Sequence, residues 1–258
     1  MSELLNRVRR YELESIRNLF SPGAEVVEIG GGNGFQASII ASWGCKVCSF
    51  DLADRPASQP SHHPVADYDG VHLPLPDASA DVVFSSNVLE HVRNLPALLA
   101  ETVRISRPGA RSVHILPTPS WRFWSIVTHY PLVVLTALGI PAGFVDWTDR
   151  DARLARVRER GRGHLLRRAL WPGPHGEFPG ALSELIGFRA VHWTRALEAA
   201  GFTIESVTAS GLYYSGYGLF KGLPITARRR MAPVLGSSTQ VIVARAQSAP
   251  EARRGGSS

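Results

Sequence analysis

Cysteine is scarce in this sequence, because Cys45 and Cys48 are the only two among 258 residues. They form CKVC, a spacing that also occurs in redox and metal-binding motifs. The chain lacks a second Cys/His pair at metal-ligand spacing, however, and CKVC leads straight into an apolar strand pattern. We therefore expect both cysteines to pack in the core and predict no metal site, and so few cysteines fit a reducing cytoplasm.

The N-terminus lacks the hydrophobic region of a secretory signal, and the chain lacks a repeat of fixed period. Apolar residues at helical spacing within residues 1–22 instead predict an amphipathic helix. Charged residues make up only 19% of the chain and hydrophobic residues 44%, a composition that disfavours disorder. Residues 247–258 are the exception: they lack apolar anchors and are predicted to form a disordered tail. We expect a cytoplasmic protein.

Acidic residues are outnumbered, and the net charge is +6 with a pI of about 9.8. This balance favours anionic partners such as nucleic acid, phospholipid headgroups or phosphorylated substrates. Much of the positive charge lies in residues 150–168, and Arg228, Arg229 and Arg230 form a second run. Runs of this kind are more often solvated faces than binding sites, so the charge alone does not identify a partner.

Strand and helix patterns alternate along most of the chain. They predict an α/β fold: a doubly wound, Rossmann-like, mostly parallel seven-stranded sheet with helices on both faces. The domain is expected at residues 23–246, with a helical insertion at 118–180 after the fifth strand. The predicted strands are 26–29, 46–50, 64–68, 81–85, 111–116, 202–210 and 239–244, and the predicted helices are 35–43, 95–105 and 190–200.

The stretch VVEIGGGNGF at 26–35 is a strand pattern that runs into glycines and then a helix, an arrangement that gathers backbone N–H groups around a ligand. A P-loop would continue with Lys-Ser/Thr after Gly34, and a dinucleotide fingerprint would have its third glycine at Phe35. Neither is present. Glu28 followed by glycine at every second position suits a cationic ligand better than a pyrophosphate.

Here the sequence resembles the class I S-adenosylmethionine-dependent methyltransferases, within them the group often called type 11. The resemblance covers about residues 25–116 and rests on further motifs in the family's order. These are Asp51 after the second strand pattern, Asp69-Gly70 followed by LPLPD at 73–77, DVVFSSNVLEH at 81–91, and RPG at 107–109. The sequence departs from the family at Gly31, where cysteine or another small residue is common, and at Ala80, where phenylalanine is usual.

The resemblance implies that S-adenosylmethionine is the cofactor. Glu28 would help to position its amino-acid end, directly or through water, Asp51 would hold both ribose hydroxyls, and Asp69-Gly70 would lie beside the adenine. The cofactor-binding residues implied are Glu28, Gly30, Gly32, Gly34, Asp51, Leu52, Asp69, Gly70, Ser85 and Asn87.

Two histidines are candidate catalytic residues, because methylation of a hydroxyl needs a base to take its proton. His91 follows the fourth strand, where related enzymes border the acceptor pocket, although it also fits a surface or helix-capping histidine. His175, beside Glu177 in a Pro/Gly-bounded loop, is the second candidate, and an ordinary turn is the alternative. His114 lies inside the fifth predicted strand and is expected to be buried structure.

The insertion contains 23 residues without a formal charge, between Arg122 and Asp146. A true membrane span would separate the last two strands from their sheet, and Pro131 and Pro141 interrupt the segment. Two interpretations remain: an apolar lid over a hydrophobic acceptor pocket, and a peripheral membrane contact through residues 121–168 with arginines on headgroups.

The function predicted from these features is a cytoplasmic, or peripherally membrane-associated, S-adenosylmethionine-dependent methyltransferase. Its acceptor would be a small, hydrophobic or lipid-linked molecule, with a sugar or other hydroxyl as the methylated group. RNA methylation is an alternative prompted by the basic pI, but the chain lacks an appended RNA-binding motif and the Asn/Asp-Pro-Pro-Tyr/Phe sequence after the fourth strand, so nucleic acid is not the expected partner. A catalytically idle binding or scaffold protein is the other alternative.

Overall fold

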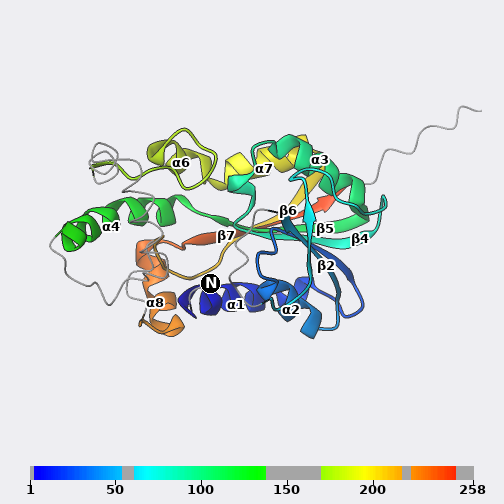
Figure 1. Cartoon of the computed structure of the whole chain (residues 1–258), viewed down its shortest axis with the longest axis horizontal. Coiled ribbons are helices and arrows are strands. Elements are labelled where there is room, and N and C mark those ends of the chain that lie inside the picture. Colours follow the sequence, from blue (N-terminus) through cyan, green and yellow to red (C-terminus); the bar gives the residue numbers. More distant parts are fainter. Residues whose placement is uncertain (1–2, 54–60, 138–169, 217–221, 248–258) are drawn as a thin grey trace, which may run out of the picture. The chain divides into compact units, whose positions relative to one another are not determined.

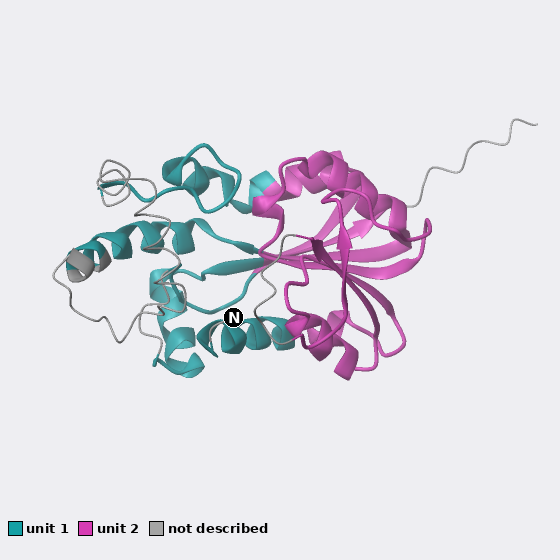
Figure 2. Cartoon of the chain, in the orientation of Figure 1, with its two compact units in different colours: residues 1–15, 116–192, 209–240 teal, residues 16–115, 193–208, 241–258 magenta. Residues whose placement is uncertain are grey.

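The computed structural model describes residues 3–53, 61–137, 170–216 and 222–247. The chain divides into two compact units (Figure 2). Unit 1 comprises residues 1–15, 116–192 and 209–240, and unit 2 comprises residues 16–115, 193–208 and 241–258. The basic run at 150–168 and the tail beyond residue 247 lie outside the described residues, so the predictions made for them stay predictions.

Seven strands form one mixed, mostly parallel sheet in the order β3-β2-β1-β4-β5-β7-β6 (Figure 1). The pairs β3–β2, β2–β1, β1–β4 and β4–β5 are all parallel. The predicted fold class is therefore confirmed. The strand bounds are β1 Glu25–Ile29, β2 Lys46–Leu52, β3 Val65–Tyr68, β4 Ala80–Ser86, β5 Ser106–Pro117, β6 Phe202–Ala209 and β7 Thr239–Ala246.

Helices cover both faces of the central strands because the connections on the two sides of β1 cross over in opposite directions. The connection from β1 through α2 (Phe35–Ser42) reaches β2 on one side, and the connection from β4 through α3 (Leu95–Ile105) reaches β5 on the other. Right-handed crossovers in opposite directions place their helices on opposite faces, as Figure 2 shows for unit 2. This double cover explains why β1 and β4 are buried almost throughout.

The helix α3 begins and ends as its sequence predicts, but the strand that follows it does not. Asn94 caps α3 by accepting a hydrogen bond from the N–H of Ala97, and the helix buries Leu98, Leu99 and Ile105. The strand β5 begins directly at Ser106, so the predicted break at 107–109 lies within the strand. The register between β4 and β5 shifts over this stretch, and the irregularity accommodates a proline and a glycine inside a strand.

Among the described residues, four helices lie wholly within unit 1: α1 (Glu3–Ser15), α4 (Pro119–Ala137), α6 (Ala181–Gly187) and α8 (Ile225–Leu235). The predicted N-terminal helix is confirmed but ends at Ser15, with a separate 3-10 turn at Arg17–Leu19. The helices α6 and α8 were not predicted. The helix α7 (Ala190–Ala199) was predicted to within one residue.

Two sequence expectations about individual residues are wrong. The helix α4 runs through Pro131, so this proline does not interrupt it. Cys45 is buried as expected, but Cys48, like Lys46 two residues before it on β2, is exposed. Among the helices that the structure describes, none has the length and apolar character needed to cross a membrane.

Candidate functional site

The glycine loop between β1 and α2 is held closely by two neighbours within unit 2. A Cβ atom on Gly30 would lie 2.2 Å from a methyl group of Val88, and one on Gly34 would lie 2.5 Å from the carbonyl oxygen of His63. Gly34 is also the N-cap of α2, with a φ of 75° that a residue with a side chain rarely adopts. These two glycines therefore fix the path of the loop.

Gly32 lies in a different environment, beside open space. Among the described residues, no heavy atom lies within 4 Å of the place a Cβ on Gly32 would take. Its N–H donates a hydrogen bond of 2.6 Å to Oδ2 of Asp51 at the end of β2. Gly32 also has a positive φ of 57°. The loop thus presents bare backbone next to a carboxylate, on a side where a ligand has room.

Asp51 is arranged to receive hydrogen bonds from a ligand. Its Oδ1 atom accepts the N–H of Leu52 at 2.7 Å, and Oδ2 accepts the N–H of Gly32. A carboxylate has about four lone-pair positions, so both oxygens retain acceptor capacity. The Leu52 side chain is 44% exposed next to it. This combination suits a polar ligand that offers hydroxyl donors and an adjacent apolar surface.

Glu28 is a buried carboxylate, only 2% exposed, on β1. It accepts a hydrogen bond of 2.6 Å from the hydroxyl of Ser49, its register partner on β2. Burial raises the pKa of Glu28 to about 7, the Ser49 hydrogen bond opposes this, and the negative charge of Asp51 adds to it. Near neutral pH the group therefore titrates, and a cation brought close would favour its ionised form.

The hydrogen bond between Glu28 and Ser49 leaves no room for a side chain at Gly31. A Cβ atom there would lie 1.9 Å from Oγ of Ser49 and 2.9 Å from Oε2 of Glu28. Any side chain at this position would displace one of the two partners. The departure from the family pattern at Gly31 thus has a local structural reason.

Asp69 and Gly70 form the turn that follows β3. Oδ1 of Asp69 accepts the N–H groups of Val71 and His72, and Oδ2 contacts Nδ1 of His72 at 2.9 Å. The hydrogen bonds from His72, first through its side chain, lower the pKa of Asp69 to about 2. Gly70 has a φ of 93°. The ionised carboxylate holds the turn, which presents its exposed side to solvent.

Ser85 and Asn87, at the end of β4, differ in their surroundings. The Ser85 hydroxyl is fully buried and lies 2.8 Å from Nδ1 of His114, whose Nε2 lies 2.7 Å from Oγ of Ser112. Burial lowers the pKa of His114 to about 4, so this histidine is neutral structure, as the sequence predicts. The Ser85 hydroxyl is thereby used in a buried contact with His114 on the neighbouring strand β5. Asn87 directly follows β4 and has a positive φ of 54°.

His91 lies in the 3-10 turn Leu89–His91 that follows β4. Its side chain is 44% exposed, and its Nε2 atom lies 3.9 Å from Oε1 of Glu90, a carboxylate with no exposed side-chain surface. Glu90 was not predicted from the sequence. The sequence shows only that Glu90 stands between Leu89 and His91 and gives no sign that its carboxylate is buried.

His175 belongs to unit 1, and the structure shows what holds its backbone. Its N–H and that of Gly176 donate hydrogen bonds of 2.5 and 2.7 Å to Oε1 of the buried Glu184. The other oxygen of Glu184 lies 2.6 Å from Nε of Arg122 on α4. The ring of Trp121 packs edge-on against His175 at 4.6 Å. The loop is therefore firmly positioned, and neither Arg122 nor Glu184 was predicted from the sequence.

Comparisons with known proteins agree on one family. Residues 5–207 match a family model described as a methyltransferase domain. The chain is 36% identical over 94 residues to the malonyl-[acyl-carrier protein] O-methyltransferase of Serratia marcescens, covering 34% of this chain and 36% of that protein. It is 33% identical over 102 residues to a probable S-adenosylmethionine-dependent methyltransferase of Mycolicibacterium smegmatis, covering 38% and 39%. The matched stretch thus spans less than two fifths of these relatives.

A solved structure shows the same fold over most of the chain. An S-adenosylmethionine-dependent methyltransferase from Mesorhizobium loti superposes with a TM-score of 0.53, covering 91% of this chain and 97% of that one. The sequence identity is 20%, so this likeness is a likeness of fold.

Proposed function

The chain belongs to the methyltransferase-domain family, and from this premise we propose that it methylates a hydroxyl oxygen of a small, hydrophobic or lipid-linked acceptor. The protein is an S-adenosylmethionine-dependent methyltransferase, with S-adenosylmethionine as the methyl donor. The acceptor, the methylated atom and the roles of individual residues are the parts that we propose.

The residues around the glycine loop fit the cofactor. S-adenosylmethionine carries an ammonium group, a sulfonium and two ribose hydroxyls, and the loop region offers carboxylates at Glu28 and Asp51. The open space beside Gly32 would be filled by any side chain there. On the first turn of α2, the amide nitrogen of Gln36 is buried without a hydrogen-bond partner in the described part of the chain. An unpaired buried donor at this place favours a ligand that accepts a hydrogen bond.

The observation that carries the assignment of the cofactor site is the buried Glu28, because no cation in the described residues pairs with it. When bound, S-adenosylmethionine supplies a methyl group activated for displacement. The protein then has to hold the acceptor in line, exclude water and take a proton from the acceptor hydroxyl. We assign the proton transfer to the imidazole of His91, whose Nε2 atom lies 3.9 Å from the carboxylate of Glu90.

An exposed apolar stripe on α4 supports a hydrophobic acceptor. Its members recur at helical spacing and are between 40 and 56% exposed, which is unusual for large apolar side chains. The stripe consists of Phe123, Val127, Tyr130 and Val134. It fits either the lid or the peripheral membrane contact through residues 121–168. Much of that segment lies outside the described residues. The name of the Serratia relative, an O-methyltransferase for a carrier-bound acyl group, supports oxygen as the methylated atom.

Calorimetry with S-adenosylmethionine tests the cofactor site. Asp51→Asn keeps an acceptor for the N–H of Gly32 but removes the charge that strengthens hydrogen bonds to ribose. We expect it to weaken binding about a hundredfold, or about 3 kcal/mol. Glu198→Gln removes an exposed carboxylate from α7 and serves as the control, which should bind normally. Equal affinity in Asp51→Asn and the wild type would contradict the assignment.

The acceptor is tested by incubating a host extract with methyl-labelled S-adenosylmethionine and identifying the product by mass spectrometry. We expect the label in an organic-extractable molecule, on oxygen. Label on nucleic acid would contradict the proposal in favour of RNA methylation, and label on nitrogen would contradict the hydroxyl acceptor. With the acceptor known, His91→Ala should lower kcat by about 100-fold with little change in KM.

A further inference from the structure

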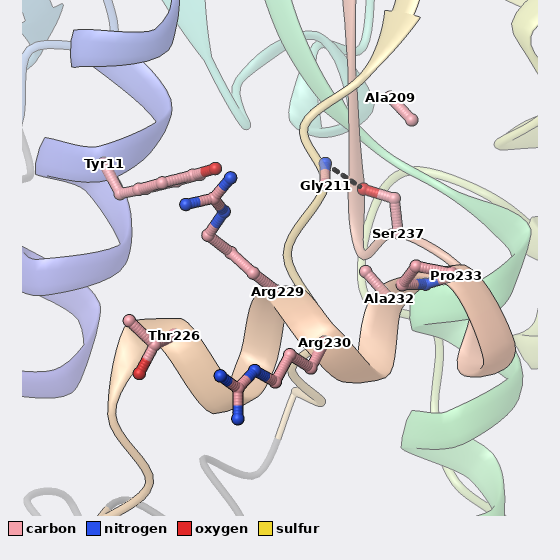
Figure 3. A pocket seen from close by; sticks show the side chains of 9 residues that line it. All are labelled: Tyr11, Ala209, Gly211, Thr226, Arg229, Arg230, Ala232, Pro233 and Ser237. Atoms are coloured by element: carbon pink, nitrogen blue, oxygen red, sulfur yellow. Dashed lines mark hydrogen bonds between the residues drawn. The ribbon is translucent and has the colours of Figure 1, made fainter.

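An open pocket of about 680 Å³ lies within unit 1, between α1 and α8 (Figure 3). Its wall includes Tyr11 of α1, five residues of α8 and Ser237, which precedes β7. The α8 residues are Thr226, Arg229, Arg230, Ala232 and Pro233. All of these except Ala232 lie at positions i, i+3, i+4 and i+7, so they form one face of the helix. None of the residues already assigned to the cofactor or to proton transfer lines this pocket.

Among the described residues that line it, the pocket is positively charged and has no carboxylate. Its lining residues include Arg229 and Arg230 but no aspartate or glutamate, and the sequence of α8, ITARRRMAPVL, has no acidic residue. Within the part of the chain that the structure describes, neither guanidinium forms an ion pair with a carboxylate, and both residues are exposed. Two neighbouring arginines without an acid between them repel each other unless an anion lies near.

Tyr11 holds one of these arginines in place. The guanidinium of Arg229 lies over the Tyr11 ring, 5.8 Å from its centroid, and Figure 3 shows the side chain extending from α8 toward the ring. The nearest carboxylate along α1, Glu12, is fully buried and accepts hydrogen bonds from Tyr214 and Thr239, so it does not neutralise the pocket. The Tyr11 ring thereby orients the Arg229 side chain, and the guanidinium remains charged with N–H groups that can donate hydrogen bonds.

Further positive charge lies behind this face of α8. Arg228 is 1% exposed, and its Nε donates to the carbonyl of Leu223, which also accepts from Arg7. Burial, and then the charge of Arg7, lower the pKa of Arg228. The N-terminus of α8 adds to the potential, because Pro224 at the N-cap supplies no side-chain hydrogen bond to the first N–H groups.

From this arrangement we infer that the pocket between α1 and α8 binds a phosphate group. Arg229 and Arg230 would supply charge-assisted hydrogen bonds, and the hydroxyl of Thr226 a further donor. Ala209, Ala232 and Pro233 would form an apolar wall for the remainder of the ligand. The phosphate belongs either to a soluble phosphorylated molecule or to a phospholipid headgroup, and both offer the same chemistry to the two arginines. The inference does not depend on the acceptor proposed above.

Titration calorimetry of the full chain with inorganic phosphate, at constant ionic strength, tests the inference. The variant R229Q/R230Q should bind phosphate at least about tenfold more weakly than the wild type. The control R189Q/R195Q removes the same charge from two exposed arginines outside the pocket and should change the affinity less than about twofold. Tyr11→Leu, which releases Arg229 without changing the charge, should weaken binding about threefold.

Vesicles distinguish the two sources of phosphate. Cosedimentation with vesicles of phosphatidylcholine and phosphatidylglycerol, lost in R229Q/R230Q and reversed by inorganic phosphate, would assign the pocket to a headgroup. Phosphate binding without cosedimentation would assign it to a soluble molecule. Failure of the wild type to bind either probe, or an equal loss in R229Q/R230Q and R189Q/R195Q, would overturn the inference. Thermal unfolding of each variant confirms that it is folded.

Discussion

Glu28 of unit 2 differs from the buried carboxylates of unit 1, and from Glu101 of its own unit, because no cation lies beside it among the described residues. In unit 1, Glu12 contacts Arg9 at 3.0 Å and Glu184 contacts Arg122 at 2.6 Å, so each buried acid has a cation beside it. In unit 2, the buried Glu28 has only the Ser49 hydroxyl as its hydrogen-bond partner among the described residues. Its pKa is raised to about 7. A buried carboxylate without a counterion destabilises the folded protein. Such a group is expected at a binding site, where a cationic ligand supplies the missing positive charge.

This difference separates a positioning role from a binding role. The acids of unit 1 join segments that are far apart in sequence and complete their charge balance inside the protein. Glu28 leaves its charge balance open at a loop with room for a ligand. Variants of the unit 1 acids and their partners should therefore lower stability without changing cofactor affinity. Variants that alter Glu28, or its hydrogen bond with Ser49, should also change cofactor affinity.

The largest effect is expected for Arg122→Ala. This change leaves Glu184 as a buried carboxylate without its cation and should lower the free energy of unfolding by about 3–5 kcal/mol. Urea unfolding measures the loss. The double variant Arg122→Met/Glu184→Gln removes both charges and should lose much less. Calorimetry should show unchanged affinity for S-adenosylmethionine in any fraction that remains folded, and a large loss of affinity would break the distinction between the units.

The example of Arg122 and Glu184 shows what sequence reasoning missed. They are 62 residues apart, and the sequence between them contains no motif that pairs them, so the ion pair follows from tertiary packing alone. The cofactor loop was predictable because a strand, a turn and a helix specify it within ten residues. The Gly31 constraint was not, since it depends on the register between β1 and β2 that places Ser49 beside Glu28.

The strands were predictable for a related reason. Buried parallel strands appear as short apolar runs between helices, and Val83 and Phe84 are examples with no exposure at all. The helices α6 and α8 were missed because their sequences are short or rich in arginine and give weak periodicity. The exposure of Cys48 was missed because an apolar run does not reveal which face of a strand is covered.

A smaller effect is expected from the titration of Glu28. Its pKa is raised from 4.5 to about 7 in the folded protein, so the folded state holds a proton that the unfolded state loses above its ordinary pKa. The free energy of unfolding should therefore fall as pH rises across this window, by up to about 3 kcal/mol. Urea unfolding at several pH values should show this slope, and Glu28→Gln should remove it. A cationic ligand favours the ionised form, so affinity for S-adenosylmethionine should rise over the same window.

Gly31→Ala should cost about 2 kcal/mol of unfolding free energy, because the new methyl group displaces Ser49 and leaves Glu28 without its hydrogen bond. Unlike the Arg122 variant, it should also weaken binding of S-adenosylmethionine. Adding Ser49→Ala removes the hydroxyl that the methyl group strikes, so the double variant should be more stable than the sum of the two single losses predicts. Strict additivity in urea unfolding would show that the clash does not involve Ser49.

The smallest effect is expected for Tyr214→Phe in unit 1. The Tyr214 hydroxyl donates to Oε1 of Glu12 at 3.1 Å, and the same oxygen also accepts the hydroxyl of Thr239. Glu12 keeps Thr239 and Arg9 as partners in this variant, so the loss should be about 1 kcal/mol, that of a single hydrogen bond. Thermal unfolding is the measurement, with unchanged affinity for S-adenosylmethionine. A loss as large as that of Arg122→Ala would mean that Glu12 depends on Tyr214 for its charge balance, and that the acids of unit 1 are less well compensated than their ion pairs indicate.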